Sequence, residues 1–325
     1  MAVAMSERTT EAPQSKYDRL IARAKEVPPA ATVAAYPCDQ SSLKGVAEAA
    51  EAGIITPILV GPAAKITSAA RAANVDISKF QLEDTPDLES AAAARSVELI
   101  REGKAEVLMK GSLHTDELMR AVTSSATGLR TARRISHVFI MDVPSHPDTL
   151  VITDAAINIF PDLDVKRDII QNAIDLFLQI GTGTPRVAIL SAVETVTTKI
   201  PSTIEAAALC KMADRGQIKG GILDGPLAFD NAIDPEAARI KGIKSEVAGR
   251  AQILVVPDLE AGNMLAKNLT FMAKADAAGL VLGARVPIVL TSRADSVRTR
   301  MASCAVAVLS ANARRLAAGA ALPAA

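Results

Sequence analysis

Short apolar runs rich in β-branched residues alternate along the chain with longer segments whose apolar residues recur at helical spacing. The runs are bounded by Gly, Pro or Asp, which is typical of buried strands. Strands are predicted at residues 31–37, 56–62, 105–111, 135–143, 148–156, 185–192, 219–226, 251–258 and 285–292. Helices are predicted at residues 17–27, 39–53, 62–74, 114–124, 165–181, 201–216, 260–275 and 296–319, with Thr115 and Ser202 as N-caps of two of them.

This alternation predicts an α/β protein with a parallel or mixed sheet and helices on both faces. Residues 135–143 and 148–156 are separated only by Pro144 to Pro147, so a local antiparallel pair is expected there. Such sheets bind ligands beyond the carboxyl ends of their strands. The polar clusters at predicted strand ends are therefore candidate sites: Lys110-Gly111-Ser112, Thr153-Asp154, Ser191, Asp224-Gly225-Pro226, Pro257-Asp258 and Thr291-Ser292-Arg293.

The segment "LTSRADS" (290–296) has two interpretations. In one, Ser292 caps the next helix, Arg293 offers a guanidinium fork for phosphate or carboxylate, and Asp295 is a proton acceptor. In the other, the serine is only a cap, the arginine is solvated, and the aspartate is a first-turn acid that matches the helix dipole. The segment alone does not decide between them.

Two further segments carry similar signals. In "PDLEAGNMLAKNL" (257–269), Gly262 and Asn263 would let a ligand approach the backbone, although a capped surface helix explains the pattern equally well. In "LMKGSLHTDELMR" (108–120), Lys110 ends a strand and Arg120 follows in the next helix. These two cations indicate either a basic pocket or two unrelated solvated side chains.

Composition excludes several classes of function. Lys plus Arg equals Asp plus Glu, 36 each, and aromatic residues make up 2%, which argues against nucleic acid or an anionic membrane as the main partner. The three cysteines and three histidines have no metal-ligand spacing, and we predict no metal. No signal peptide or membrane-spanning segment is evident, so a cytoplasmic protein with reduced thiols is expected. Neither a dinucleotide-binding nor a Walker A glycine motif is present.

Taken together, several segments resemble the phosphate acetyl/butyryl transferase family. They are "MKGSLHTDELMRAV", "TDAAINIFPDLDVKRDIIQNAI", "RVAILSAVETV", "PSTIEAAAL", "LDGPLAFDNAI", "VAGRAQILVVPDLEAGNMLAKNL" and "PIVLTSRADS". They occur in the family's order from about residue 105 to residue 310. The form "TSRADS" is more similar to the butyryltransferase-type branch, including the version fused to an enoyl-CoA hydratase domain, and no such domain is found here.

The resemblance implies a two-lobed, three-layer α/β/α fold like that of isocitrate and isopropylmalate dehydrogenases, usually as a homodimer. Residues 1–158 and 282–325 would form one lobe and residues 159–281 an inserted second lobe, with the active site in the cleft between them. The implied reaction is reversible acetyl or butyryl transfer between coenzyme A and inorganic phosphate. The acyl-CoA thioester and phosphate are then small-molecule substrates, and no tightly bound cofactor is expected.

The resemblance also assigns roles. Ser292 and Asp295 would be catalytic. Phosphate and CoA would be bound by Arg293, Arg120, Lys110, Asn263, Gly262 and Asn158. In the acetyl branch an aspartate lies seven residues beyond the serine, and here that position is Thr299, which cannot act as a base at neutral pH. Asp295 is the nearest carboxylate, with Asp258 as the fallback.

Two alternatives remain open at this point. One is a metal- and NAD-dependent hydroxy-acid dehydrogenase on the same fold, which would need a cluster of metal-binding carboxylates or histidines. The other is a CoA-binding regulator that lost the base, an option that Thr299 keeps open.

Overall fold

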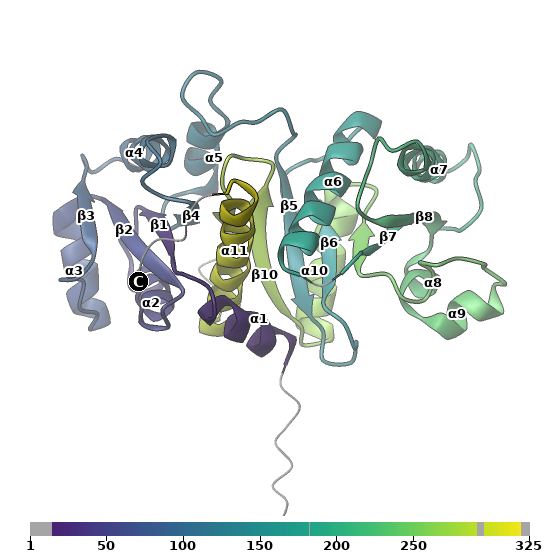
Figure 1. Cartoon of the computed structure of the whole chain (residues 1–325), viewed down its shortest axis with the longest axis horizontal. Helices are drawn as coiled ribbons and strands as arrows, with labels where there is room; N and C mark the ends of the chain where they lie inside the picture. The colour runs from purple at the N-terminus through teal and green to yellow at the C-terminus, as the bar shows by residue number, and fades with distance from the viewer. Residues whose placement is uncertain (1–14, 182, 291–295, 320–325) are drawn as a thin grey trace, which may run out of the picture.

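A computed structural model describes residues 15–181, 183–290 and 296–319. Its centre is an 11-stranded mixed sheet in the order β3-β2-β1-β4-β11-β10-β5-β6-β9-β7-β8 (Figure 1). The strands are β1 (Ala30–Ala35), β2 (Ile55–Gly61), β3 (Gln81–Asp84), β4 (Val107–Lys110), β5 (Ser136–Asp142), β6 (Leu150–Thr153), β7 (Arg186–Leu190), β8 (Ile222–Leu227), β9 (Ile253–Val255), β10 (Asp276–Leu282) and β11 (Ile288–Val289).

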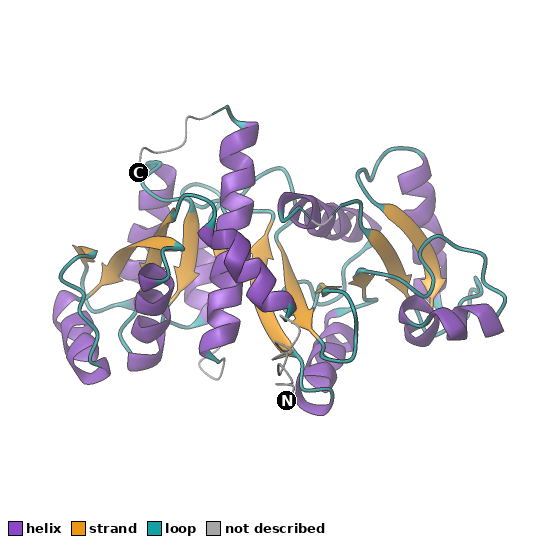
Figure 2. Cartoon of the chain, turned by 60° about the horizontal axis from the view of Figure 1, so that its bottom comes forward, coloured by secondary structure: helices purple, strands orange, loops and turns teal. Residues whose placement is uncertain are grey.

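Helices cover both faces of this sheet (Figure 2). Helices α1, α2 and α6 contact α11 on one face, and α4 and α5 pack together against β1, β2 and β4 (Figure 1). The predicted three-layer α/β fold is therefore confirmed. The helices are α1 (Lys16–Lys25), α2 (Gln40–Glu51), α3 (Ala63–Ala73), α4 (Glu89–Arg101), α5 (Thr115–Thr123), α6 (Leu163–Gln179), α7 (Pro201–Asp214), α8 (Phe229–Ile233), α9 (Pro235–Ile240), α10 (Leu259–Met272) and α11 (Val297–Ala317).

The direction of the strands reverses in the middle of the sheet. Strands β1 to β4 and β11 are mutually parallel, whereas β10 is antiparallel to both β11 and β5. Strand β6 is antiparallel to β5, as predicted from the short Pro-containing connection, and β6, β9, β7 and β8 are parallel to one another. The carboxyl ends of the two parallel sets consequently point in opposite directions along the sheet.

The core consists of small aliphatic side chains packed between the layers, as expected from a composition with few aromatics. Helix α11 contributes most to it, since nearly all of its residues from Ala302 to Ala311 are buried. Close packing of Ala, Val and Ile replaces the large aromatic side chains of other cores.

Five elements were not predicted, and three predicted caps are wrong. Strand β3 is polar, the helices α4, α8 and α9 were not assigned, and β10 contains Gly279, which weakens a strand pattern. Helix α5 is preceded by His114, not capped by Thr115, and α7 follows Ile200, whereas Ser202 bonds to Ser191 (Oγ–Oγ 2.8 Å). Helix α11 begins after Ser296, whose hydroxyl accepts from the Thr299 amide, so Ser292 is not its cap.

Candidate active site

The candidate residues fall into two groups because the strand direction reverses. Asn158, Gly262 and Asn263 lie at the carboxyl ends of β6 and β9. Lys110 lies at the carboxyl end of β4, next to the end of β11 that leads into residues 291–295. Arg120 is on α5, the helix that follows β4.

The loop after β6 is organised by the buried carboxylate of Asp154. One carboxylate oxygen accepts from the amides of Ala156 and Ile157, both at 3.0 Å. The other accepts from the amide of Asn158 at 3.3 Å and from its side-chain Nδ2 at 2.6 Å. Since four donors converge on this group, Asp154 fixes the shape of the loop, and its oxygens are occupied by hydrogen bonds within the protein.

Asn158 and Asn263 meet at this loop. The Asn158 amide also donates to the carbonyl of Ile135 (2.9 Å), and its Oδ1 accepts from Arg134 Nε (3.1 Å). Asn263 Nδ2 donates to the carbonyl of Ala155 at 3.3 Å. The structure therefore brings these two predicted residues together, with Arg134 as a cation that the sequence reasoning did not single out.

Gly262 allows α10 to approach the same loop. A Cβ atom built at this position would lie 3.0 Å from the Asp154 carbonyl oxygen, 3.0 Å from Ala155 Cβ and 2.8 Å from Val256 Cγ2. The contact with Val256 is closer than real Cβ atoms show, and the other two are tighter than most Cβ contacts, so a side chain here would force its neighbours to shift. The sequence predicted that a ligand approaches the backbone at Gly262. In the structure the loop after β6 and Val256 lie at that position instead.

His137, on β5, is buried beside this loop. Burial lowers its pKa to about 4, and the charge of Asp154 opposes that shift. The ring is therefore neutral at pH 7, and it packs edge-on against Phe139 with ring centroids 4.5 Å apart. A Cβ at Gly279 would lie 3.0 Å from His137 Nε2 and 3.1 Å from the Leu290 carbonyl oxygen, which explains the glycine in β10.

Lys110 is buried at the end of β4. Its Nζ donates to the carbonyls of Gly111 (3.1 Å) and Leu113 (3.0 Å). Val289 pairs with Met109 in the parallel ladder between β11 and β4, and Lys110 is the next residue of β4. Ser292 and Arg293, which the resemblance groups with Lys110, lie outside the described residues.

Arg120 is exposed on α5. Its Nη1 donates to Glu117 Oε1 at 2.7 Å, and an exposed pair of this kind exchanges readily for another anion. Both side chains line a hollow with Glu89 and His114, which are hydrogen-bonded to each other at 2.9 Å. An anionic ligand of Arg120 would therefore enter an environment that contains carboxylates.

The residues predicted to carry the chemistry, Ser292, Arg293 and Asp295, lie outside the described residues. Thr299, at the position of the family's aspartate, is buried in the first turn of α11, and its hydroxyl oxygen lies 3.0 Å from Ser296 Oγ. The fallback base Asp258 is the N-cap of α10, where its Oδ1 accepts from the Ala261 amide at 2.9 Å. Both groups therefore have helix-capping roles.

Nucleophilic catalysis by a cysteine does not fit the structure. Burial raises the pKa of the Cys38, Cys210 and Cys304 thiols to about 12, so none is a thiolate at neutral pH. Among residues 15–181, 183–290 and 296–319, no cluster of three His, Cys, Asp or Glu side chains could hold a metal ion. Within the same ranges, no helix combines the length and apolarity that a membrane span requires.

These features define an α/β protein with a mixed sheet and helices on both faces, a class in which ligands generally bind beyond the carboxyl ends of the strands. Residues 87–308 match the family described as phosphate acetyl/butaryl transferase. The chain belongs to this family, whose members are acyltransferases, and the resemblance seen in the sequence is confirmed.

Named relatives are similar over nearly the whole chain. The phosphate acetyltransferase of Rhizobium meliloti is 74% identical over 303 residues, which cover 93% of this chain and 96% of that protein. The phosphate butyryltransferase of Clostridium beijerinckii is 42% identical and covers 90% and 97% respectively.

Solved structures agree with the family assignment. A branched-chain phosphotransacylase from Enterococcus faecalis superposes with a TM-score of 0.76 at 29% identity, over 86% of this chain and 99% of that one. A 4-hydroxythreonine-4-phosphate dehydrogenase from Burkholderia phymatum, at 15% identity and a TM-score of 0.53, covers 88% of this chain and 98% of that one and shows a shared fold only.

Proposed function

We propose that this protein is a phosphate acyltransferase that transfers an acetyl group reversibly between coenzyme A and inorganic phosphate. The observation that carries this proposal is the 74% identity with a phosphate acetyltransferase, since it extends over 93% of the chain. The lower identity with a phosphate butyryltransferase, 42%, favours acetyl over butyryl, whereas "TSRADS" points to the butyryl-type branch. Substrate preference is therefore part of the test.

In the proposed reaction, a phosphate oxygen attacks the thioester carbonyl carbon and the carbon–sulfur bond breaks. The products are acyl phosphate and the CoA thiolate, which takes up a proton. Arg293 and Arg120 bind the phosphate, Ser292 donates to the developing oxyanion or to sulfur, and Lys110 adds positive charge beside them. The raised thiol pKa values support direct attack over a cysteine acyl-enzyme.

We assign proton transfer to Asp295. Thr299 has no carboxylate, Asp258 caps α10, and Asp154 is held by four donors. Asn263, in the proposed lobe 159–281, would contact CoA from across the cleft, and Asn158, at the edge of the proposed lobe 1–158 with 282–325, would contact it beside Asn263.

The proposal is tested by following phosphate-dependent CoA thiol release from acetyl-, propionyl- and butyryl-CoA. We expect the highest kcat/KM with acetyl-CoA. Arg293→Ala should raise the KM for phosphate about 10- to 100-fold, because a charge-assisted contact contributes about 1.5–3 kcal/mol. Arg239→Ala, which removes an exposed arginine paired with Glu236 on α9, is the matched control. No phosphate-dependent thiol release from any of the three thioesters would refute the proposal.

The two alternatives are not favoured. A hydroxy-acid dehydrogenase shares only the fold, at 15% identity. A regulator that binds CoA without turnover would show CoA binding in calorimetry and no thiol release, so the same assay separates it from the enzyme.

We further infer a cytoplasmic homodimer that forms through α10. Phe271 and Met272 are each 79% exposed, and Met264 lies on the same helical face as Phe271. Phe160 is also exposed at the other end of α10, where the Leu259 amide donates to the Ile159 carbonyl. An apolar patch of this kind is unusual on a monomer and suits a second copy of the chain.

Sedimentation velocity tests the dimer. The wild-type chain should sediment as a dimer and Phe271→Glu as a monomer with unchanged circular dichroism. The matched control, Leu88→Glu, changes an equally apolar exposed residue away from α10 and should remain dimeric. A wild-type monomer at micromolar concentration would contradict the inference.

A further inference from the structure

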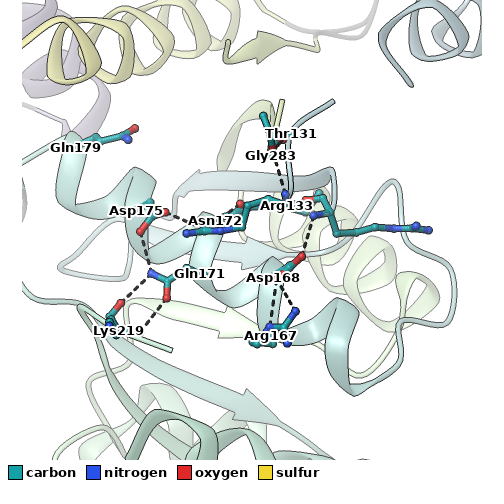
Figure 3. Close-up of polar contacts among 12 residues, drawn as sticks. Thr131, Arg133, Arg167, Asp168, Gln171, Asn172, Asp175, Gln179, Lys219 and Gly283 are labelled. Atoms are coloured by element: carbon teal, nitrogen blue, oxygen red, sulfur yellow. Dashed lines mark hydrogen bonds and ion pairs between the residues drawn. The ribbon is translucent and has the colours of Figure 1, made fainter. Parts of the chain in front are cut away.

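A cavity of about 180 Å³ lies between α6, the last turns of α11, the β10–β11 connection and the segment before β5 (Figure 3). It is located at the amino end of β11, away from the carboxyl end that leads to residues 291–295. None of the residues assigned to acyl transfer lines it. Its polar lining consists of Thr131, Arg133, Asn172, Asp175, Gln179 and Arg314.

The charges around this cavity do not balance. Two guanidinium groups, those of Arg133 and Arg314, share one lining carboxylate, that of Asp175. Arg133 Nη1 bonds to Asp175 Oδ2 at 3.0 Å, and the other oxygen of Asp175 accepts from Gln171 at 2.9 Å (Figure 3). Arg314 Nη1 donates to the carbonyl of Arg285 at 2.8 Å, which is a neutral acceptor.

Burial lowers the pKa of Arg314, whereas the charge of Asp175 opposes that shift. An arginine nevertheless stays protonated in proteins. A half-buried guanidinium with a neutral acceptor is stabilised by a nearby anion. The neighbouring carboxylate of Asp168 is already engaged by Arg167 and by the Arg134 amide, so it does not supply that charge (Figure 3).

The remaining walls suit a short carbon chain with a second polar end. Leu176, Leu282 and Ala284 form the apolar part of the lining. Asn172, Asp175 and Gln179 project from one face of α6. The Oε1 atom of Gln179 accepts from Ser310 at 2.6 Å, and the Nε2 donors of Gln179 take no part in that hydrogen bond. The volume is below the 300–1,000 Å³ that is typical of drug-sized ligands, so CoA or a nucleotide would not fit.

We propose that this cavity binds a short-chain carboxylate of about four carbons, with its carboxylate group on Arg133 and Arg314 and its chain against Leu176 and Leu282. The planar guanidinium fork matches a carboxylate, and the apolar wall distinguishes such a ligand from inorganic phosphate. This site is separate from the proposed active site, and its occupation does not depend on the proposed function.

Titration calorimetry of the full chain with succinate tests the site, with butyrate, orthophosphate and chloride as separate titrants. We expect one succinate per chain, weaker binding of butyrate, and binding weakened at least tenfold in Arg133→Gln and in Arg314→Gln. Arg133 is partly exposed, so its variant should fold even if the Arg314 variant does not. The matched control Arg239→Gln should bind like the wild type.

Arg293→Ala identifies the site that is being titrated. If this variant still binds succinate, the result supports the cavity as the binding site. If binding is lost, succinate binds at the proposed phosphate site and the inference is overturned. Absence of binding at millimolar succinate would overturn it too. Tighter binding of orthophosphate than of succinate, sensitive to Arg133→Gln, would overturn the assignment to a carboxylate.

Discussion

The surroundings of the loop after β6 and helix α5 contain predicted ligand-binding residues in contrasting settings. After β6, Asn158 and Asn263 are bound to a buried network centred on Asp154. On α5, Arg120 is exposed and holds one neighbouring carboxylate, that of Glu117. Polar side chains of the first kind stabilise the fold that shapes a site, whereas those of the second kind remain available to a ligand. Substitutions should therefore affect stability in the first region and kinetics in the second.

The largest effect is expected at Asp154. Asp154→Ala removes the buried acceptor of four hydrogen bonds, two of them from the buried residue Asn158, and should lower the free energy of unfolding by about 3–5 kcal/mol. Urea denaturation measures this change. Asp116→Ala, an exposed aspartate in the first turn of α5, should stay within about 0.5 kcal/mol of the wild type. Equal effects of the two substitutions would contradict the comparison.

A smaller effect is expected from the pH dependence of His137. Its folded pKa is about 4, below its ordinary value of 6.5, so the unfolded chain binds the proton first as the pH falls. The contribution of the neutral ring to the free energy of unfolding is fully present above pH 6.5 and is lost between pH 6.5 and 4. At about 1.4 kcal/mol per pKa unit, the loss is about 3 kcal/mol.

Urea denaturation of the wild type and of His137→Gln between pH 7.5 and 4 isolates this contribution, because the other titrating groups are common to both chains. The difference in unfolding free energy between them should shrink toward low pH. His146→Gln, which changes a partly exposed histidine in the β5–β6 connection, serves as the control for the substitution itself. A constant difference across this pH range would show that His137 is not buried as a neutral ring.

The smallest effect on folding is expected at Arg120. Arg120→Gln should raise the KM for phosphate about 5- to 10-fold and change the unfolding free energy by less than about 0.5 kcal/mol, since its ion pair with Glu117 is exposed. Steady-state kinetics and urea denaturation on the same preparation separate the two. Arg101→Gln, at the exposed end of α4, is the matched control. A large loss of stability with unchanged KM would place Arg120 among the structural residues.

Much of the fold was predictable because apolar periodicity is a local property. Strands such as β1, β2 and β7 and helices such as α6 lie within a few residues of their predicted bounds. Strand β10 was not predicted because Gly279 interrupts its apolar pattern. A glycine is needed there because His137 and the Leu290 carbonyl lie close to it, and the sequence around residue 279 does not reveal these contacts. The cap predicted at Ser202 failed for a related reason, since its hydroxyl bonds to Ser191, the residue that follows β7.

For the candidate site, residue types were easier to predict than their roles. The sequence indicated Asn158, Gly262 and Asn263 as ligand-binding residues, and the structure places all three around Asp154. Asp154 organises them because the turn after β6 brings their donors together around its carboxylate. No rule on the spacing of residues in the sequence predicts such a turn. The roles of Ser292, Arg293 and Asp295 remain predictions, since these residues lie outside the described ranges.

The strand order has a consequence for the synthesis of the chain. Strands β4 and β5 are consecutive in sequence, yet β11 and β10 lie between them in the sheet. Their facing edges cannot form the native pairing until β10 and β11 have been synthesised, and α11 then covers the junction. A nascent chain that pauses before residue 276 should therefore expose two open strand edges, which favour aggregation and chaperone binding.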